Sequence, residues 1–176
     1  MDNNSKKINK LTQLSLFLAI GIILNLVEAM IPLPISIPGV KLGLANTIGL
    51  VLLYYYSEKE YLLIGLARVI FVGLLRTGLF SMTFVISLGG WFLSSLIVIL
   101  LYKFKTFSIF GLSIASAVFH GIGQIFVVMI YYNTTGIVLY LPILMLTGVI
   151  TGLLTSGITA LVLSKVNPHI KHITHN

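Results

Sequence analysis

The sequence contains no cysteine and very little charge. Without cysteine the fold has neither disulfides nor thiolate chemistry, and metal sites of the cysteine type are excluded. Only 9% of the 176 residues are charged. In the apolar segments no second histidine or carboxylate stands at ligand spacing from another, so we expect no metal site and no cofactor. A glycine-rich phosphate loop of the GxxxxGK[ST] type is also missing, so any energy from ATP must come from another protein.

What the chain has in abundance is apolar sequence. Apolar residues make up 57% of it, and the mean hydropathy is +1.07, which a soluble domain of this size would not tolerate. The apolar runs cover residues 14–31, 42–56, 61–75, 79–102, 109–132 and 138–164. Since a helix needs roughly 20 residues to cross a bilayer, we predict an all-α, polytopic membrane protein. Its six-helix transmembrane domain spans residues 14–164, between polar tails at 1–13 and 165–176.

The second and third runs are short for membrane spans. A fused re-entrant pair is the alternative, but it would bury the polar residues 57–60 at high cost. We therefore expect two separate helices.

Lysine positions predict the orientation. If the N-terminus is cytoplasmic, eight lysines fall on the inner side, and only Lys41 and Arg76 fall outside. The inner set is Lys6, Lys7, Lys10, Lys59, Lys103, Lys105, Lys165 and Lys171. The positive-inside rule then places both termini in the cytoplasm and the chain in the cytoplasmic membrane. The basic residues are dispersed at helix ends, which favours lipid headgroups over nucleic acid as partners.

The outer connection PLPISIPGVK, residues 32–41, has three prolines and a glycine, so it is not expected to be helical. It is either a lid over the outer face or a stiff connector.

Polar residues at membrane depth are the most informative, because each is costly unless it is paired or faces a wet cavity. His120 and Gln124 are four residues apart, so they share one helix face, either as a ligand site or as an interhelical hydrogen-bonding pair. Arg68 lies inside the third span and either snorkels inward or faces a buried partner or anionic ligand. Glu28 lies near the outer end of the first helix, where a cation can neutralise it.

Two further features concern the half of the predicted membrane domain that faces outside. Lys41 and Arg76 would make an outer vestibule basic and favour an anionic solute. Trp91 follows two glycines inside the fourth span and is either a packing residue or a pocket wall. Asn46 completes the proposed site.

Small residues recur at four-residue spacing in three helices, which lets helices approach closely. Tight internal packing is the simpler explanation, and docking of another membrane subunit is the alternative. The sets are Gly148, Gly152, Ser156 and Ala160; Ser113, Ala117 and Gly121; and Ser15 and Ala19.

Four blocks resemble one bacterial family: PGVKLGLAN at residues 38–46, Arg76-Thr77, SLGG at residues 87–90, and HGIGQ at residues 120–124. This is the Gx transporter family, also described as heptaprenyl diphosphate synthase component I. The resemblance covers the chain from about Glu28 onward, although many relatives have asparagine where this chain has Gly121.

The family in turn is similar in architecture to the substrate-binding subunits of energy-coupling-factor transporters. That resemblance implies six helices, a solute pocket open to the outside under a lid, and a transmembrane coupling subunit with two ATPases. Ser15 and Ala19 would then help docking. The implied ligand is a small metabolite, anionic or aromatic, such as a vitamin, a flavin or an isoprenoid or quinone precursor.

Prenyl transfer itself does not fit the residues. Magnesium held against a diphosphate needs clustered carboxylates, and Asp2 is the only aspartate. We therefore expect a solute-binding or transport subunit and not an enzyme. The alternative is a membrane scaffold for a prenyl synthase, for menaquinone synthesis or for flavin-linked electron transfer. The predicted solute-binding residues are Glu28, Lys41, Asn46, Arg68, Arg76, Trp91, His120 and Gln124.

Overall fold

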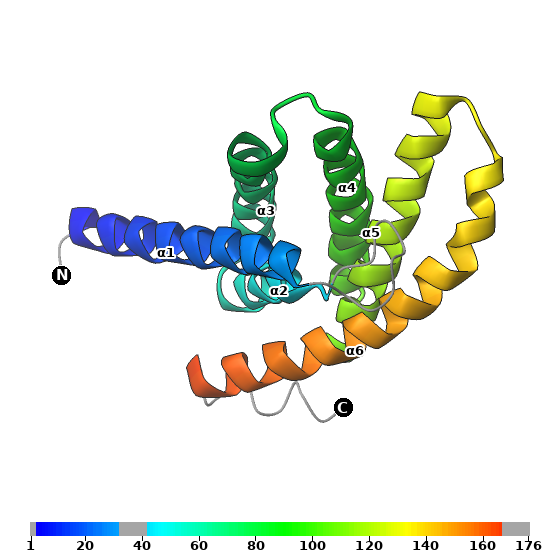
Figure 1. Cartoon of the computed structure of the whole chain (residues 1–176). Coiled ribbons are helices and arrows are strands. Elements are labelled where there is room, and N and C mark those ends of the chain that lie inside the picture. Colours follow the sequence, from blue (N-terminus) through cyan, green and yellow to red (C-terminus); the bar gives the residue numbers. More distant parts are fainter. Residues whose placement is uncertain (1–2, 32–41, 167–176) are drawn as a thin grey trace.

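The computed structural model describes residues 3–31 and 42–166, and these residues form helices joined by short turns, without a strand. Figure 1 shows α3, α4 and α5 side by side, with α1 crossing in front of α3 and α6 along the lower edge. The elements are α1 (Asn3–Met30), α2 (Leu44–Tyr55), α3 (Glu58–Val72), the π-helix η1 (Gly73–Thr77), α4 (Met82–Lys103), α5 (Ile109–Tyr132), the 3₁₀-helix η2 (Gly136–Tyr140) and α6 (Leu141–Val166). The all-α prediction is confirmed.

Serines mark the starts of three helices. The side chains of Ser57, Ser81 and Ser108 accept hydrogen bonds from backbone N–H groups in the first turns of α3, α4 and α5, at 3.3, 3.2 and 3.3 Å. Such N-caps satisfy donors that the helix itself leaves without partners. At the other end of α5, Asn133 adopts a left-handed conformation with φ 47°, which lets the chain turn towards η2.

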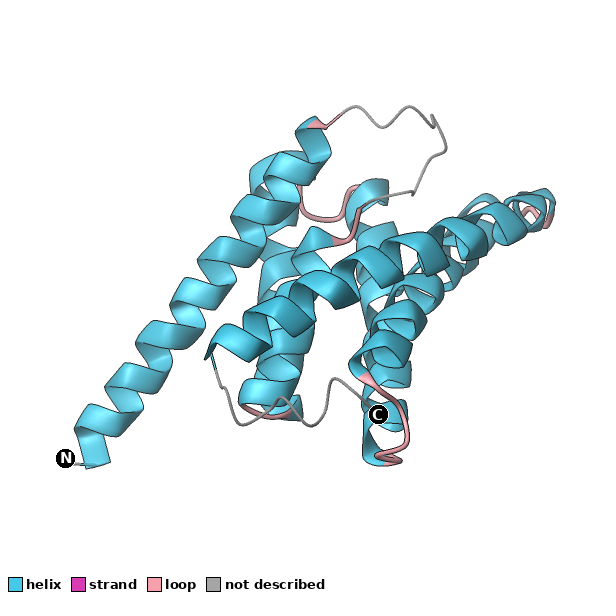
Figure 2. Ribbon diagram, turned by 90° about the horizontal axis from the view of Figure 1, so that it is seen from below, coloured by secondary structure: helices cyan, strands magenta, loops and turns pink. Residues whose placement is uncertain are grey.

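Contacts between helix ends establish an alternating up-and-down path. At one end of the bundle Lys10 of α1 pairs with Glu60 of α3 at 2.5 Å, and Lys103 of α4 pairs with Glu58 at 3.5 Å. At the other end the backbone N–H of Gly43, just before α2, donates to Glu28 of α1 at 2.5 Å. Figure 2 shows α1 as a straight rod along one side of the bundle.

Four helical segments are long and apolar enough to cross a membrane: residues 3–30, 82–103, 109–132 and 136–165. Many of their large apolar side chains are exposed, including Leu16, Phe92, Phe126 and Leu161, as expected of surfaces that contact lipid. The chain is therefore a multi-pass membrane protein.

α2 is shorter than predicted. Its 12 residues rise about 18 Å at ~1.5 Å per residue, well short of the ~30 Å hydrocarbon core. The first helix also starts at Asn3, ahead of the apolar run, so the part of the predicted N-terminal tail that is described is helical. The described part of the chain forms six α-helices, while six complete spans, the cytoplasmic termini and the predicted domain limits remain predictions. The proline-rich connection, residues 32–41, lies outside the described residues.

The small-residue ladder of α6 packs inside the molecule. A side-chain carbon added at Gly148 or Gly152 would meet the α5 backbone, at 3.1 Å from Val118 Cα and 2.6 Å from Ile114 Cα. The Ser113 hydroxyl donates to the carbonyl of Gly152 at 2.8 Å across the same contact. For these positions the structure supports internal packing over docking of another subunit.

Candidate functional site

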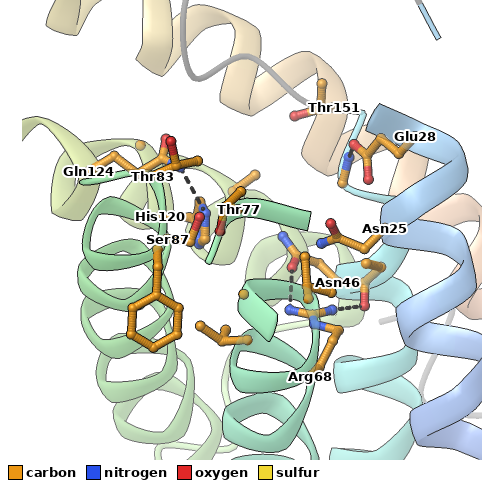
Figure 3. Close-up of a pocket in the computed structure, with 18 of the residues that line it drawn as sticks. Asn25, Glu28, Asn46, Arg68, Thr77, Thr83, Ser87, His120, Gln124 and Thr151 are labelled. Carbon is orange, nitrogen blue, oxygen red and sulfur yellow. Dashed lines mark hydrogen bonds between the residues drawn. The ribbon is translucent and has the colours of Figure 1, made fainter. Parts of the chain in front are cut away.

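A pocket between the helices is lined by residues of all six α-helices and of η1, and many of them are polar. Its cavity volume is about 90 Å³, against the ~10–15 Å³ that one water needs on the same measure, so it has room for several waters or a compact solute. Figure 3 shows polar side chains around it on two sides. The polar lining residues are Asn25, Glu28, Asn46, Arg68, Arg76, Thr77, Thr83, Ser87, His120, Gln124, Thr147 and Thr151.

One wall belongs to α4 and α5. His120 and Gln124 lie on the same face of α5, as their spacing predicts, and the Gln124 Nε2 lies 3.3 Å from the His120 Nε2. Gln124 is only 5% exposed. Its side-chain oxygen is buried and has no hydrogen-bond partner among the described residues. A buried acceptor of this kind is costly unless something donates to it.

Glycines bring α4 and α5 close enough to form this wall. A side-chain carbon added at Gly123 would lie 2.6 Å from the carbonyl oxygen of Gly89, so the two backbones touch. A carbon added at Gly90 would lie 2.9 Å from both His120 and Gln124. The SLGG and HGIGQ blocks are therefore two halves of one helix crossing.

The opposite wall comes from α1, α2 and α3. Arg68 donates hydrogen bonds to the carbonyl oxygen of Ala45 and, at 3.3 Å, to the side chain of Asn46. Arg68 is thus held by the first turn of α2 and does not snorkel inward. Glu28, 7% exposed, accepts the bond from Gly43 beside the same turn.

η1 completes the rim. This π-helix continues α3 and places Arg76 and Thr77 against the pocket. A carbon added at Gly73, where η1 begins, would lie 2.5 Å from the Phe84 ring, so glycine lets α4 pack there. π-helical turns occur frequently at functional sites. Two arginines and one glutamate line the pocket, so its lining carries a net positive charge if His120 is neutral.

A second, smaller cavity of about 20 Å³ lies next to the first, and Asn46, Arg68 and His120 line both. Trp91 lines only this smaller cavity. Its indole nitrogen would be 2.5 Å from a carbon added at Gly65, so Trp91 packs over a glycine of α3. Trp91, which was predicted to bind the solute, therefore does not line the main pocket.

The pocket gathers six of the eight predicted solute-binding residues: Glu28, Asn46, Arg68, Arg76, His120 and Gln124. Lys41 lies outside the described residues. Ser15 and Ala19 lie on an exposed face of α1, far along the helix from Glu28.

The polar pocket residues that were not predicted as solute-binding residues are Asn25, Thr77, Thr83, Ser87, Thr147 and Thr151. Asn25 precedes Glu28 by three residues and so shares its helix face, a usable signal. The others are small hydroxyl residues that also occur on lipid-facing and packed helix surfaces, so nothing in the sequence distinguishes them. Within residues 3–31 and 42–166 there is no group of three or more potential metal ligands.

The fold and the pocket define a multi-pass helical membrane protein with a polar cavity buried among its helices. The sequence profile of the heptaprenyl diphosphate synthase component I family matches residues 17–162. The chain belongs to this family, which confirms the resemblance carried by the four sequence blocks. Comparisons with curated proteins and with solved structures give no match.

Proposed function

We propose that the protein is the solute-binding membrane subunit of a transporter of the energy-coupling-factor type, and that it takes a small anionic solute into the pocket from the outer face. The observation that carries the proposal is the cluster of Arg68, Arg76, His120 and Gln124 around a cavity in an otherwise apolar bundle. Polar and ionisable groups at membrane depth are expensive and usually mark a ligand or ion path.

The short helix α2 supports this assignment. Its N-terminal turn lies at the pocket, where Gly43 and Ala45 bond to Glu28 and Arg68. In many transporters, discontinuous helices begin at the substrate site within the membrane, with irregular backbone lining the cavity. With α2 crossing only part of the bilayer, the pocket would lie at such a site.

Charge sets the class of solute. Arg76 is exposed at the pocket rim, and no carboxylate lies within ion-pair distance of it among the described residues. Arginine binds carboxylate and phosphate groups through several parallel hydrogen bonds. The cavity volume favours a compact solute over a flavin or an isoprenoid chain.

Energy coupling would come from a partner. Ser15 and Ala19 are exposed on α1, away from the pocket, where a transmembrane coupling subunit with two ATPases would dock in the cytoplasmic membrane. Replacing Ala19 with tryptophan should remove a co-purifying coupling subunit and leave solute binding intact. Retention of that subunit would locate docking elsewhere.

The test of the proposal is native mass spectrometry of protein purified in mild detergent, with identification of the small molecules it releases. The expected result is one stoichiometric solute that raises the melting temperature of the wild type, as a ligand of the folded state must. Gln124→Met should lose that solute, whereas the matched control Gln13→Met, in the N-terminal half of α1 and outside the pocket lining, should retain it. Release of lipid alone would reject the proposal.

The family description favours a second candidate, a membrane scaffold for a prenyl synthase or redox partner at the inner face. Exposed lysines at that end, Lys105 and Lys165 among them, would contact the partner. Reversing their charge should then release a co-purifying soluble enzyme while the pocket variants have no effect. The transporter proposal predicts the opposite pattern.

A further inference from the structure

The main pocket has two chemically different walls. Figure 3 shows Gln124, His120, Thr83 and Ser87 on one side, and Arg68, Asn46, Asn25 and Glu28 on the other. Both arginines of the pocket belong to α3 and η1, whereas the α4 and α5 side carries hydroxyl, imidazole and amide groups. We call this side the neutral wall, because none of its described lining residues is a lysine, an arginine or a carboxylate. A solute that satisfies both walls needs two kinds of group.

The side-chain amide of Gln124 lacks one hydrogen-bond donor. Its nitrogen is directed to His120, and its oxygen is buried in the wall without a donor among the described residues. Gln124 packs directly on Gly90 of α4, since a carbon added at Gly90 would lie 2.9 Å from the Gln124 Cγ. The Gln124 side chain therefore cannot move closer to α4. Gln124 lines the cavity, so this unpaired oxygen belongs to a side chain in the cavity wall.

We propose that the solute is a compact anion that also carries a hydrogen-bond donor, a hydroxyl or an N–H group, which pairs with the side-chain oxygen of Gln124. Arg76 binds the anionic group, and Arg68, which lines the same pocket, adds positive charge. This inference rests on the proposed solute-binding function and narrows its substrate class. A site that holds a buried acceptor discriminates against analogues without the donor, because they leave the acceptor unpaired.

The experiment uses three probes of similar size on the full chain in nanodiscs: butyrate, 3-hydroxybutyrate and 1,3-butanediol. Binding is measured by titrated shifts in melting temperature at constant ionic strength. The wild type should bind 3-hydroxybutyrate about tenfold more tightly than butyrate. It should bind 1,3-butanediol, which lacks the anion, at least about tenfold more weakly than 3-hydroxybutyrate.

Variants assign the preference to Gln124. Gln124→Met removes the acceptor at nearly constant length and should bring the two acids to equal affinity. Gln124→Asn withdraws the amide by one methylene and should do the same, which covers the case in which Gln124→Met does not fold. Gln13→Met should keep the tenfold preference, and Arg76→Gln should weaken both acids together.

The outcomes separate this inference from the proposed function. Equal binding of the two acids by the wild type, or a preference that survives in both Gln124 variants, overturns the inference. The inference is also overturned if none of the three probes binds. In that case the proposed function still stands if the protein releases a stoichiometric solute in native mass spectrometry. If no solute is released and no probe binds, both proposals fail.

Discussion

Gly90 of α4 lies directly against His120 of α5, so that a single added carbon would approach the imidazole Nε2 and Cε1 to 2.9 Å. The same carbon would approach the Gln124 Cγ equally closely. The geometry of the neutral wall therefore depends on the absence of a side chain on the neighbouring helix.

Gly90→Ala should displace both His120 and Gln124 and lower solute affinity by about tenfold or more, although alanine favours the helix. The readout is the melting-temperature shift produced by the released solute. Gly157→Ala is the control, because a carbon added there meets nothing within 4 Å. Unchanged affinity in Gly90→Ala would show that the two side chains do not bind the solute in the observed arrangement.

Gly152→Ala should lower the stability of the bundle whether or not a ligand is bound. The added carbon would lie 2.6 Å from Ile114 Cα and 3.0 Å from its backbone nitrogen, and a backbone cannot rotate aside as a side chain can. Overpacking of this kind costs about 1–3 kcal/mol. Unfolding of the solubilised protein measures it, with Gly157→Ala again as the matched substitution on α6. Equal stability of the two variants would contradict the close α5–α6 contact.

The ion pair between Lys10 and Glu60 predicts a pH dependence at the end of the bundle where α3 begins. Hydrogen bonds from Lys10 and then Ser57 lower the pKa of Glu60 from 4.5 to about 2. A carboxylate with a lowered pKa stabilises the folded state above its usual pKa, and this contribution is lost as the pH falls towards the folded value. Lys10→Met should therefore be less stable than the wild type at pH 7, and the difference should shrink below pH ~4.5 and vanish near pH ~2.

Melting temperatures of both proteins across that range measure the effect, with Lys7→Met as the control. No carboxylate lies within ion-pair distance of Lys7 among the described residues. A difference between Lys10→Met and the wild type that stays constant down to pH ~2 would mean that the pair does not act through the charge of Glu60.

Much of this architecture follows from local sequence signals. The apolar runs predict the six helices, and the four-residue spacing predicts that His120 and Gln124 share a face. Because polar side chains are costly in contact with lipid, six polar residues were predicted to share one site, and these six do line one pocket. Their role in binding a solute stays a prediction.

Other features depend on contacts between helices and could not be predicted from the sequence. The apolar run at residues 42–56 does not reveal that α2 begins beside Glu28, because that position is set by the bond from Gly43 and by Arg68. The close packing of Phe84 on Gly73, where the π-helix begins, and of Trp91 on Gly65 are likewise contacts between α4 and the α3–η1 segment. Periodicity within one helix contains no such information.

Thiol accessibility in this cysteine-free chain shows whether the solute pocket opens to the outer face. Thr77→Cys places one thiol at the pocket rim, and Lys59→Cys places one at the opposite end of α3. In right-side-out vesicles a membrane-impermeant maleimide should modify the thiol at position 77 but not the one at position 59. The solute released by the purified protein should slow the reaction at position 77. Modification at position 59 alone would mean that the pocket does not open to the outer face, and a rate at position 77 that the solute does not change would mean that the pocket does not hold it.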